Sequence, residues 1–324
     1  MAELNSLPVV SASPHFKSKA TVRSIMGDVI IALMPALAAA TVLFGVRSLA
    51  LTAVSVISCV FFEYTFRRLL KRSNTIGDLS AVVTGILLAF NLPSTMPYWM
   101  VVIGAFTAIV IAKQFFGGIG QNFVNPALIG RIVLMSSFTS QIGNFQAPFA
   151  YKSEVDAVTT ATVLPRLGTD APLPSLLDMF LGVRAGCLGE VCILALLLGF
   201  VYLLIKRIIS PVIPLVYIGT VGVIMLIYSK GDFQYTLYQL MAGGLVLGAV
   251  FMATDYTTCP VSVKGKVIYA LGCGIITSLI RIFGSLPEGV SFSIIIMNIL
   301  VPHIEHLTTP RPFGSEKEEK EAAK

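Results

Sequence analysis

Residues 79–92 read Leu-Ser-Ala-Val-Val-Thr-Gly-Ile-Leu-Leu-Ala-Phe-Asn-Leu, and Pro93 follows directly. This stretch is shorter than the ~20 apolar residues that a regular helix needs to cross a hydrocarbon core about 30 Å thick. Its glycine and the proline after it predict an interrupted segment, which a membrane protein tolerates only where other helices surround it. Nine more apolar segments accompany it. The ten predicted segments are 25–46, 48–66, 79–92, 98–115, 125–139, 186–205, 211–228, 237–254, 266–283 and 289–305.

The composition agrees with a chain that lies in a bilayer. Of its 324 residues, 55% are hydrophobic and 12% are charged, and the mean hydropathy is +0.84. Soluble domains carry about 25% charged residues, so a soluble, disordered, coiled-coil or disulfide-stapled chain is excluded. The five cysteines lack the two-residue spacing of zinc or iron–sulfur ligands, and we interpret them as small core residues. The first twenty residues lack a continuous apolar core, so we expect the N-terminus to be retained.

Lys and Arg are unevenly distributed between the two sides of the predicted membrane. With the N-terminus inside, 16 of the 23 fall on the inner side, including Lys113 and the cluster at 67–78, and 6 fall outside, while Arg131 lies within a span. Because cytoplasmic loops retain basic residues, we expect both termini in the cytoplasm and residues 140–185 outside. Topology therefore explains the basic pI, and no nucleic-acid partner is expected.

The segments form two groups of five, separated by the polar connection 140–185. An odd number of spans per half means that a repeat between the halves must be inverted. One is indicated by Gly85-Ile-Leu-Leu-Ala before Asn91, which resembles Gly244-Leu-Val-Leu-Gly before Asp255. We therefore predict an all-α integral membrane protein with about ten transmembrane segments in two inverted five-helix repeats. Its parts are a leader (1–24), a first repeat (25–139), an outer loop (140–185), a second repeat (186–305) and a tail (306–324).

The outer loop contains the run Asp156-Ala-Val-Thr159-Thr-Ala161-Thr162. It resembles the signature at which a flavin transferase esterifies the phosphate of FMN to the final threonine, although Thr160 stands where glycine is usual. A hydroxyl beside a small alanine on an exposed segment is an accessible phosphate acceptor. The alternative is a threonine-rich turn whose hydroxyls satisfy local backbone groups.

Similar runs continue along nearly the whole chain, among them Ile25–Ala36, Asn122–Ala127, Phe251–Asp255 and Thr309–Pro312. In this order the chain resembles the D subunits of Rnf electron-transport complexes, and more distantly the B subunit of the sodium-pumping NADH:quinone oxidoreductase. The resemblance implies a prokaryotic plasma-membrane (inner-membrane) flavoprotein. It would be a translocase subunit, inactive alone, in a complex that couples electron transfer between ferredoxin and NAD to Na⁺ or H⁺ translocation.

The same resemblance implies cofactors and partners. FMN would be bound covalently to Thr162, with Asp156, Thr159 and Ala161 in the recognised motif, and a second, noncovalent flavin is expected to be riboflavin. The implied partners are the other Rnf subunits, a flavin transferase for maturation and the lipid bilayer. Because the chain has no Rossmann or phosphate-loop pattern, we expect nicotinamide and ferredoxin chemistry on other subunits.

Four polar residues near the spans are further candidates. Asn122 and Asn125 offer amide groups to the edge of a riboflavin ring, although Asn125 could instead cap a helix and Asn122 could close a loop. Asp255 and Glu305 are candidates for an ion pathway because acids in membrane segments are costly, although a solvated helix end is the alternative for Asp255.

Two other functions are compatible with parts of the sequence. His303, Glu305 and His306 sit within one helical turn, but such groups on a wet helix end are more often solvated, so we expect no metal site. The competing function is a non-redox solute channel or transporter built on the same inverted five-helix repeats. The motif that ends at Thr162 discriminates between the channel and the flavoprotein, since a channel has no use for it.

Overall fold

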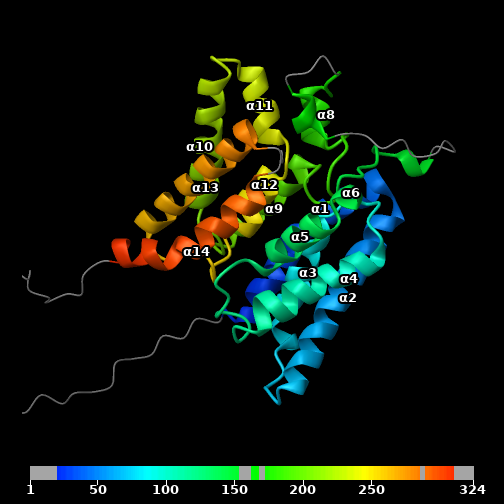
Figure 1. The fold of residues 1–324 in the computed structure, drawn as a ribbon, viewed down its shortest axis with the longest axis vertical. Helices are drawn as coiled ribbons and strands as arrows, with labels where there is room; N and C mark the ends of the chain where they lie inside the picture. The colour runs from blue at the N-terminus through cyan, green and yellow to red at the C-terminus, as the bar shows by residue number, and fades with distance from the viewer. Residues whose placement is uncertain (1–19, 153–161, 168–171, 285–288, 310–324) are drawn as a thin grey trace, which may run out of the picture.

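The computed structural model describes residues 20–152, 162–167, 172–284 and 289–309. All regular elements among these residues are helices, which confirms the prediction of an all-α protein. Figure 1 shows the helices of the first half on one side of the body and those of the second half on the other.

The first half begins with two long helices and continues with shorter ones. Its elements are α1 (Val22–Phe44), α2 (Val46–Leu69), the 3-10 turn η2 (Ile76–Asp78), α3 (Ser80–Phe90), α4 (Tyr98–Phe106), the π-helix η3 (Thr107–Gln114) that continues α4, and α5 (Pro126–Ser137). Short helices lie in the connection to the second half: α6 (Thr139–Ile142), η4 (Ala150–Lys152), α7 (Val163–Arg166) and α8 (Leu176–Leu181).

In the second half the shorter helices come first and two long helices come last. Its elements are α9 (Ile193–Ile205), α10 (Val212–Tyr228), α11 (Phe233–Met241), α12 (Leu245–Leu247), the π-helix η5 (Gly248–Met252) that continues α12, α13 (Val263–Phe283) and α14 (Val290–Thr308). Between α11 and α12 the chain bends by 61°. Gly243 and Gly244 make this bend with φ values of +67° and +66°, which glycine adopts without a steric penalty.

Helix length bears on the prediction of ten membrane segments. Within the described residues, α1, α2, α13 and α14 are long and apolar enough to cross a membrane, and the bent pair α11 with α12–η5 makes up to five. Each of the other predicted segments contains a shorter apolar helix. The chain is therefore a multi-pass helical membrane protein, with four or five crossings assigned by length.

The start of the sixth segment was predicted wrongly. Residues 186–192 form a loop, and the helix begins only at Ile193. The backbone N–H groups of Leu188 and Gly189 donate to the carbonyls of Leu92 and Phe90 at the end of α3, and that of Cys187 donates to Glu190. Because these donors bond to α3 and to a local side chain, they are not available to a continuous helix.

Close helix contacts hold the two halves together. Helix α1 packs on α9, α5 packs on α14, and one hydrophobic core runs through both halves. Glycine permits the closest approaches: a Cβ at Gly85 of α3 would lie 2.7 Å from the Cα of Val56 in α2, and a Cβ at Gly199 of α9 would collide with the carbonyl of Ala32 in α1. Small residues at such crossings are typical of helix packing in membranes.

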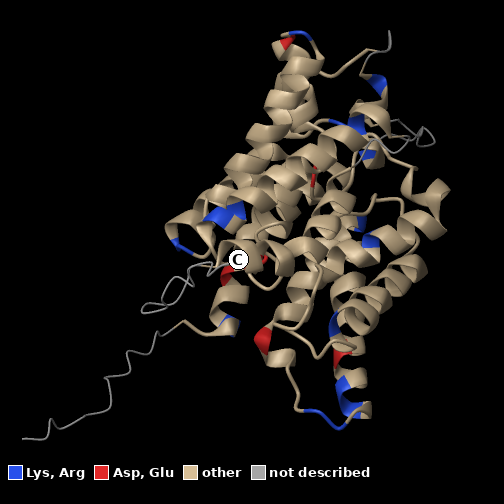
Figure 2. Ribbon diagram, turned by 60° about the vertical axis from the view of Figure 1, so that its left-hand side comes forward, with Lys and Arg blue, Asp and Glu red and all other residues tan. Residues whose placement is uncertain are grey.

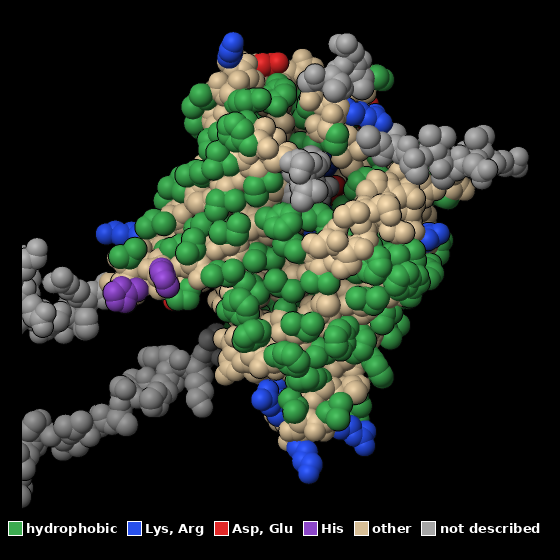
Figure 3. Space-filling model, viewed as in Figure 1, with side chains coloured by type: hydrophobic (Ala, Val, Ile, Leu, Met, Phe, Trp, Pro, Cys, Tyr) green, Lys and Arg blue, Asp and Glu red, His purple; other side chains and the backbone are tan. Residues whose placement is uncertain are grey.

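The surface has the polarity of a membrane protein. In Figure 3, hydrophobic side chains cover most of the visible flank, and Lys and Arg gather towards the ends. The basic end of α2, with Arg67, Arg68, Lys71 and Arg72, projects at one extremity, as Figure 2 also shows. We call this the basic end of the molecule and the opposite one the loop end, since α7 and α8 lie there.

Candidate functional site

A cavity opens between the two halves at the basic end. Its walls come from α1, α3, the end of η3, the start of α5, the end of α9 and the residues that follow η5. The empty space between its walls, with the open mouth included, is about 750 Å³. Mostly apolar side chains line it, with a few polar groups, including Ser80, Lys113, Asn122, Asn125 and Asp255. Three of the sequence candidates therefore lie around one cavity.

The two asparagines differ in what their amides contact. Asn125 caps α5 by accepting from the N–H of Ala127 at 3.0 Å, and it donates to the carbonyl of Met252 in η5 at 3.3 Å. The buried Asn122 instead has a side-chain oxygen with no hydrogen-bond partner among the described residues. A buried, unpartnered acceptor in a cavity wall is a place where a ligand donor can bind. The geometry of Asn125 agrees with the helix-cap alternative.

Asp255 and Glu305 occupy different surroundings. Asp255 follows η5, lines the cavity and accepts from the backbone N–H of Thr257 at 3.2 Å and from its hydroxyl at 3.0 Å. Burial raises the pKa of the Asp255 carboxyl, and the hydrogen bonds from Thr257 and the charge of Lys113 act against this shift. Glu305, on α14, accepts from the N–H of Val261 at 3.1 Å and is not among the described residues that line the cavity.

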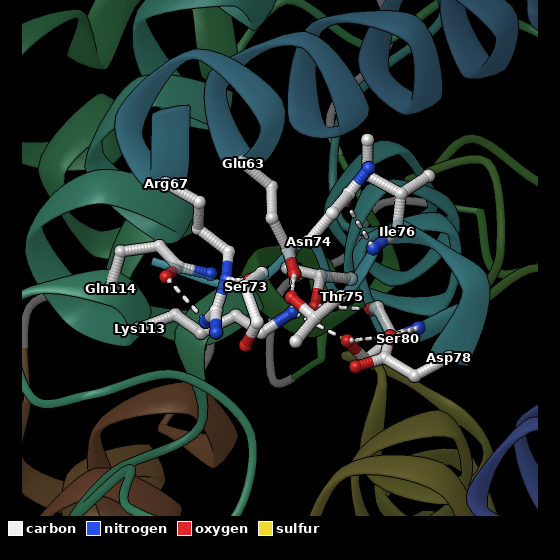
Figure 4. A network of polar contacts seen from close by, with 11 residues as sticks. Glu63, Arg67, Ser73, Asn74, Thr75, Ile76, Asp78, Ser80, Lys113 and Gln114 are labelled. Carbon is white, nitrogen blue, oxygen red and sulfur yellow. Dashed lines mark hydrogen bonds and ion pairs between the residues drawn. The ribbon is translucent and has the colours of Figure 1, made fainter. Parts of the chain in front are cut away.

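A buried ion pair forms one wall of the cavity. The ammonium of Lys113, at the end of η3, lies 2.7 Å from the carboxylate of Glu63 in α2, and both side chains are buried. Lys113 also donates to the hydroxyl of Ser80 at 2.6 Å, and Glu63 accepts from the hydroxyl of Thr75 at 2.7 Å. Figure 4 shows these groups converging from α2, the 73–80 segment and η3. The wall thus carries two opposite charges in direct contact.

The network extends to both sides of this pair. Ser80 donates to Asp78 at 2.6 Å, and Arg67 donates to the side chain of Gln114 at 3.3 Å. From the sequence, Lys113 is counted among the basic residues on the inner side, near the end of the predicted segment 98–115. In the structure Lys113 is buried at the end of a π-helix. Glu63 explains the difference, because a lysine that finds a buried carboxylate need not reach the water.

The inner end of the cavity is closed by a polar contact. Leu87 and Ala127 line the cavity, and Asn91 and Arg131 lie four residues further along α3 and α5, one helical turn deeper. The guanidinium of Arg131 is buried and donates to the side-chain oxygen of Asn91 at 2.5 Å. We call this pair the floor of the cavity. A fixed positive charge therefore lies directly behind the cavity.

Thr162 lies at the loop end, far along the chain from the cavity residues. It occupies the N-cap position of α7 with an extended backbone, but its hydroxyl makes no cap hydrogen bond to the helix. Val163 and Leu164, which follow it, are buried in a small cluster with Tyr238 and Ala242 at the end of α11. The half-buried Thr162 is thus held on an anchored turn, next to the bend of the second half, with its hydroxyl uncommitted to the cap.

A second hollow adjoins this turn. Arg166 and Arg184 are among the residues that line it, and Arg184 is buried, with an Nε that has no hydrogen-bond partner among the described residues. The guanidinium of Arg184 can therefore donate a hydrogen bond to an anion in this hollow. The other motif residues, Asp156, Thr159 and Ala161, lie outside the described residues.

Sequence reasoning located the cavity residues but missed two of their neighbours. Glu63 is not among the residues selected from the sequence, and Lys113 is used there only to assign the topology. A carboxylate in an apolar span together with a lysine in another is a signal for a buried pair. The spacing within each span does not reveal which carboxylate contacts which lysine.

These features define a multi-pass helical membrane protein with a cavity that carries a few polar groups at one end and an anchored threonine turn at the other. The family model described as "NQR2, RnfD, RnfE family" matches residues 9–314, and the chain belongs to this family.

Its relatives are similar over nearly their full length. The D subunit of the Na⁺-translocating ferredoxin:NAD⁺ oxidoreductase complex of Acetobacterium woodii is 48% identical, covering 99% of each chain. The D subunit of the proton-translocating ferredoxin:NAD⁺ oxidoreductase complex of Clostridium ljungdahlii is 42% identical, covering 95% of this chain and 96% of the relative. The D subunit of the ion-translocating oxidoreductase complex of Stutzerimonas stutzeri is 37% identical, covering 91% of this chain and 93% of the relative.

Proposed function

We propose that this chain is the membrane flavoprotein subunit of a complex that couples electron transfer between ferredoxin and NAD to the translocation of Na⁺ or H⁺. Relatives that cover 95% or more of the chain carry names of this activity. The observation that carries the proposal is the separation of two sites: Thr162 lies at the loop end, and the cavity with Asp255 opens at the basic end. The chain is a translocase subunit that works only with the other subunits.

Two flavins are part of this proposal. Thr162 would hold FMN through a phosphoester after the action of a flavin transferase, and the second hollow, with Arg184, would accept its anionic part. The cavity would hold riboflavin: its apolar walls suit a flat ring, and the unpartnered oxygen of Asn122 suits the ring's N–H donor. Bound flavins supply one- and two-electron chemistry, and the chain supplies position and electrostatics.

The proposal includes ten membrane segments in two inverted repeats. Some of the helix contacts support it, because two pairs within the first half have a counterpart in the second: α2–α4 corresponds to α10–α13, and α2–α3 to α10–α11. The pairs α1–α9 and α5–α14 then join equivalent helices across the repeat axis. With the basic end in the cytoplasm of a prokaryotic cell, both termini lie inside and Thr162 outside the plasma membrane.

The non-redox channel remains the competing function. A polar cavity alone would suit either class of protein. The floor formed by Asn91 and Arg131, with Gly189 bonded to the carbonyl of Phe90 behind it, favours a closed site over an open pore. The uncommitted hydroxyl of Thr162 favours the flavoprotein.

Flavin fluorescence of the denatured chain in a gel tests this proposal. The native chain should fluoresce, and Thr162→Ala should abolish the signal while the complex still assembles, because the change removes the acceptor oxygen at an N-cap that makes no cap hydrogen bond. Thr159→Ala should only reduce it. If the Thr162→Ala chain fluoresces like the native chain, covalent FMN is not attached at Thr162.

A further inference from the structure

Lys113 is placed between two carboxylates. Its ammonium contacts Glu63 in α2 on one side, at 2.7 Å, and on the other side it lines the cavity that Asp255 also lines. The charge of Lys113 acts on the Asp255 carboxyl. Among the described residues, Lys113 forms its ion pair with Glu63, and no ion pair involves Asp255.

The hydrogen bonds around the lysine allow it to change partners. An ammonium has three donors, and the described acceptors, Glu63 and Ser80, take two of them. Glu63 keeps the hydroxyl of Thr75 when the lysine leaves, and Asp255 keeps its bonds to Thr257. The lysine stem has four rotatable carbons and carries a compact charge, so it can reorient without moving the backbone.

We infer that Lys113 is a tethered internal cation that alternates between Glu63 and Asp255 and thereby competes with the translocated ion for Asp255. When Lys113 pairs with Glu63, Asp255 binds the ion; when Lys113 turns to Asp255, the ion leaves. Lys113 is a positioning residue in this scheme, since it acts through Asp255. The inference rests on the proposed function, which makes the cavity part of the ion pathway.

Two variants separate this role from a structural ion pair. Glu63→Gln removes the competing carboxylate at nearly constant volume, so Lys113 should turn to Asp255 and raise the ion concentration for half-maximal turnover about tenfold or more. Glu63→Gln with Lys113→Gln removes the competitor as well, so half-saturation should return to the native value or below. The double variant also avoids leaving a buried, unpaired charge, which destabilises proteins.

The measurement uses the whole complex in membrane vesicles. Ferredoxin-dependent NAD⁺ reduction is followed against Na⁺ at fixed pH, and against pH without added Na⁺, with the amount of assembled complex quantified in each sample. For a proton-translocating complex, Glu63→Gln should shift the half-maximal pH downwards by about one unit, the counterpart of the tenfold change. Lys113→Arg, which keeps the charge, should retain half-saturation close to that of the native complex.

Two results would overturn the inference. The first is native half-saturation for both Na⁺ and H⁺ in the Glu63→Gln complex, whatever amount of complex assembles. The second is a double variant that retains the raised half-saturation of Glu63→Gln, because the lysine would then not be the competitor. If Asp255→Asn has no effect on ion uptake, the proposed ion pathway itself is wrong. If Asp255→Asn impairs uptake but Glu63→Gln changes nothing, only the role of Lys113 is wrong.

Discussion

Replacing Asp255 by Asn removes a negative charge from the cavity and leaves the size of the side chain nearly unchanged. The carboxylate accepts two hydrogen bonds from Thr257, one from its N–H and one from its hydroxyl. The asparagine oxygen can keep the first, and its amide can donate to the hydroxyl of Thr257, which also accepts. The change should therefore cost the fold about 1 kcal/mol or less, comparable to one hydrogen bond between neutral groups.

The effect on the ion should be larger. A cation in contact with a carboxylate at about 4 Å gains roughly 4 kcal/mol at an effective dielectric constant near 20. Desolvation of the ion and of Asp255 offsets part of this gain, and the asparagine dipole retains another part. We expect a net loss of about 1.4–2.8 kcal/mol, which raises the half-saturating ion concentration roughly tenfold to a hundredfold.

The assay measures turnover and ion uptake in vesicles that contain the whole complex, with flavin quantified in the same sample. Glu305→Gln is the matched control, because Glu305 also accepts a backbone hydrogen bond, from Val261, but does not line the cavity among the described residues. Native rate, uptake and half-saturation in Asp255→Asn would refute the reasoning. So would an equal loss in Glu305→Gln, since the effect would then not depend on the cavity.

Two further predictions concern flavin binding and topology. Asn122→Ala should reduce noncovalent riboflavin in the purified complex about tenfold or more while covalent FMN is unchanged, measured by flavin extraction after denaturation; an unchanged riboflavin content contradicts the role of Asn122. Cysteines introduced at the exposed Ser73, at the basic end, and Ser140, at the loop end, should label from opposite sides of intact cells, and labelling of both from outside contradicts the topology.

The length and apolar character of the segments predicted the helices well. Apolar runs of about twenty residues correspond to α1, α2, α13 and α14, because a helix needs about that many apolar residues to cross the bilayer. The interrupted third and eighth segments were also recognisable, from their glycines and from Pro93. Residues 186–192 were not, since their composition is apolar and their loop structure depends on hydrogen bonds to α3, which no local pattern contains.

The sequence predicted which residues belong to the candidate site better than it predicted the contacts between them. Asn122 and Asp255 could be selected because polar groups at membrane segments are costly and few. That they share a cavity depends on the packing of α14 against η5 and against α5, which lie far apart in sequence. The bond from Asn125 to the carbonyl of Met252 is of the same kind. Such long-range contacts decide which of several plausible polar residues meet.

The floor of the cavity constrains how an ion can cross this chain. A cation that enters from the basic end and passes Asp255 next meets Arg131, which is buried one turn beyond Ala127. Two like charges at this depth repel each other strongly because the surroundings are weakly polar. A cation therefore has no straight path through the centre of this conformation. It must leave by a rearrangement at the interrupted segments, where Leu79 and Gly244 already adopt positive φ values, or through a neighbouring subunit. If the ion binds at Asp255 as proposed, this binding is the step that the chain alone would control on either route.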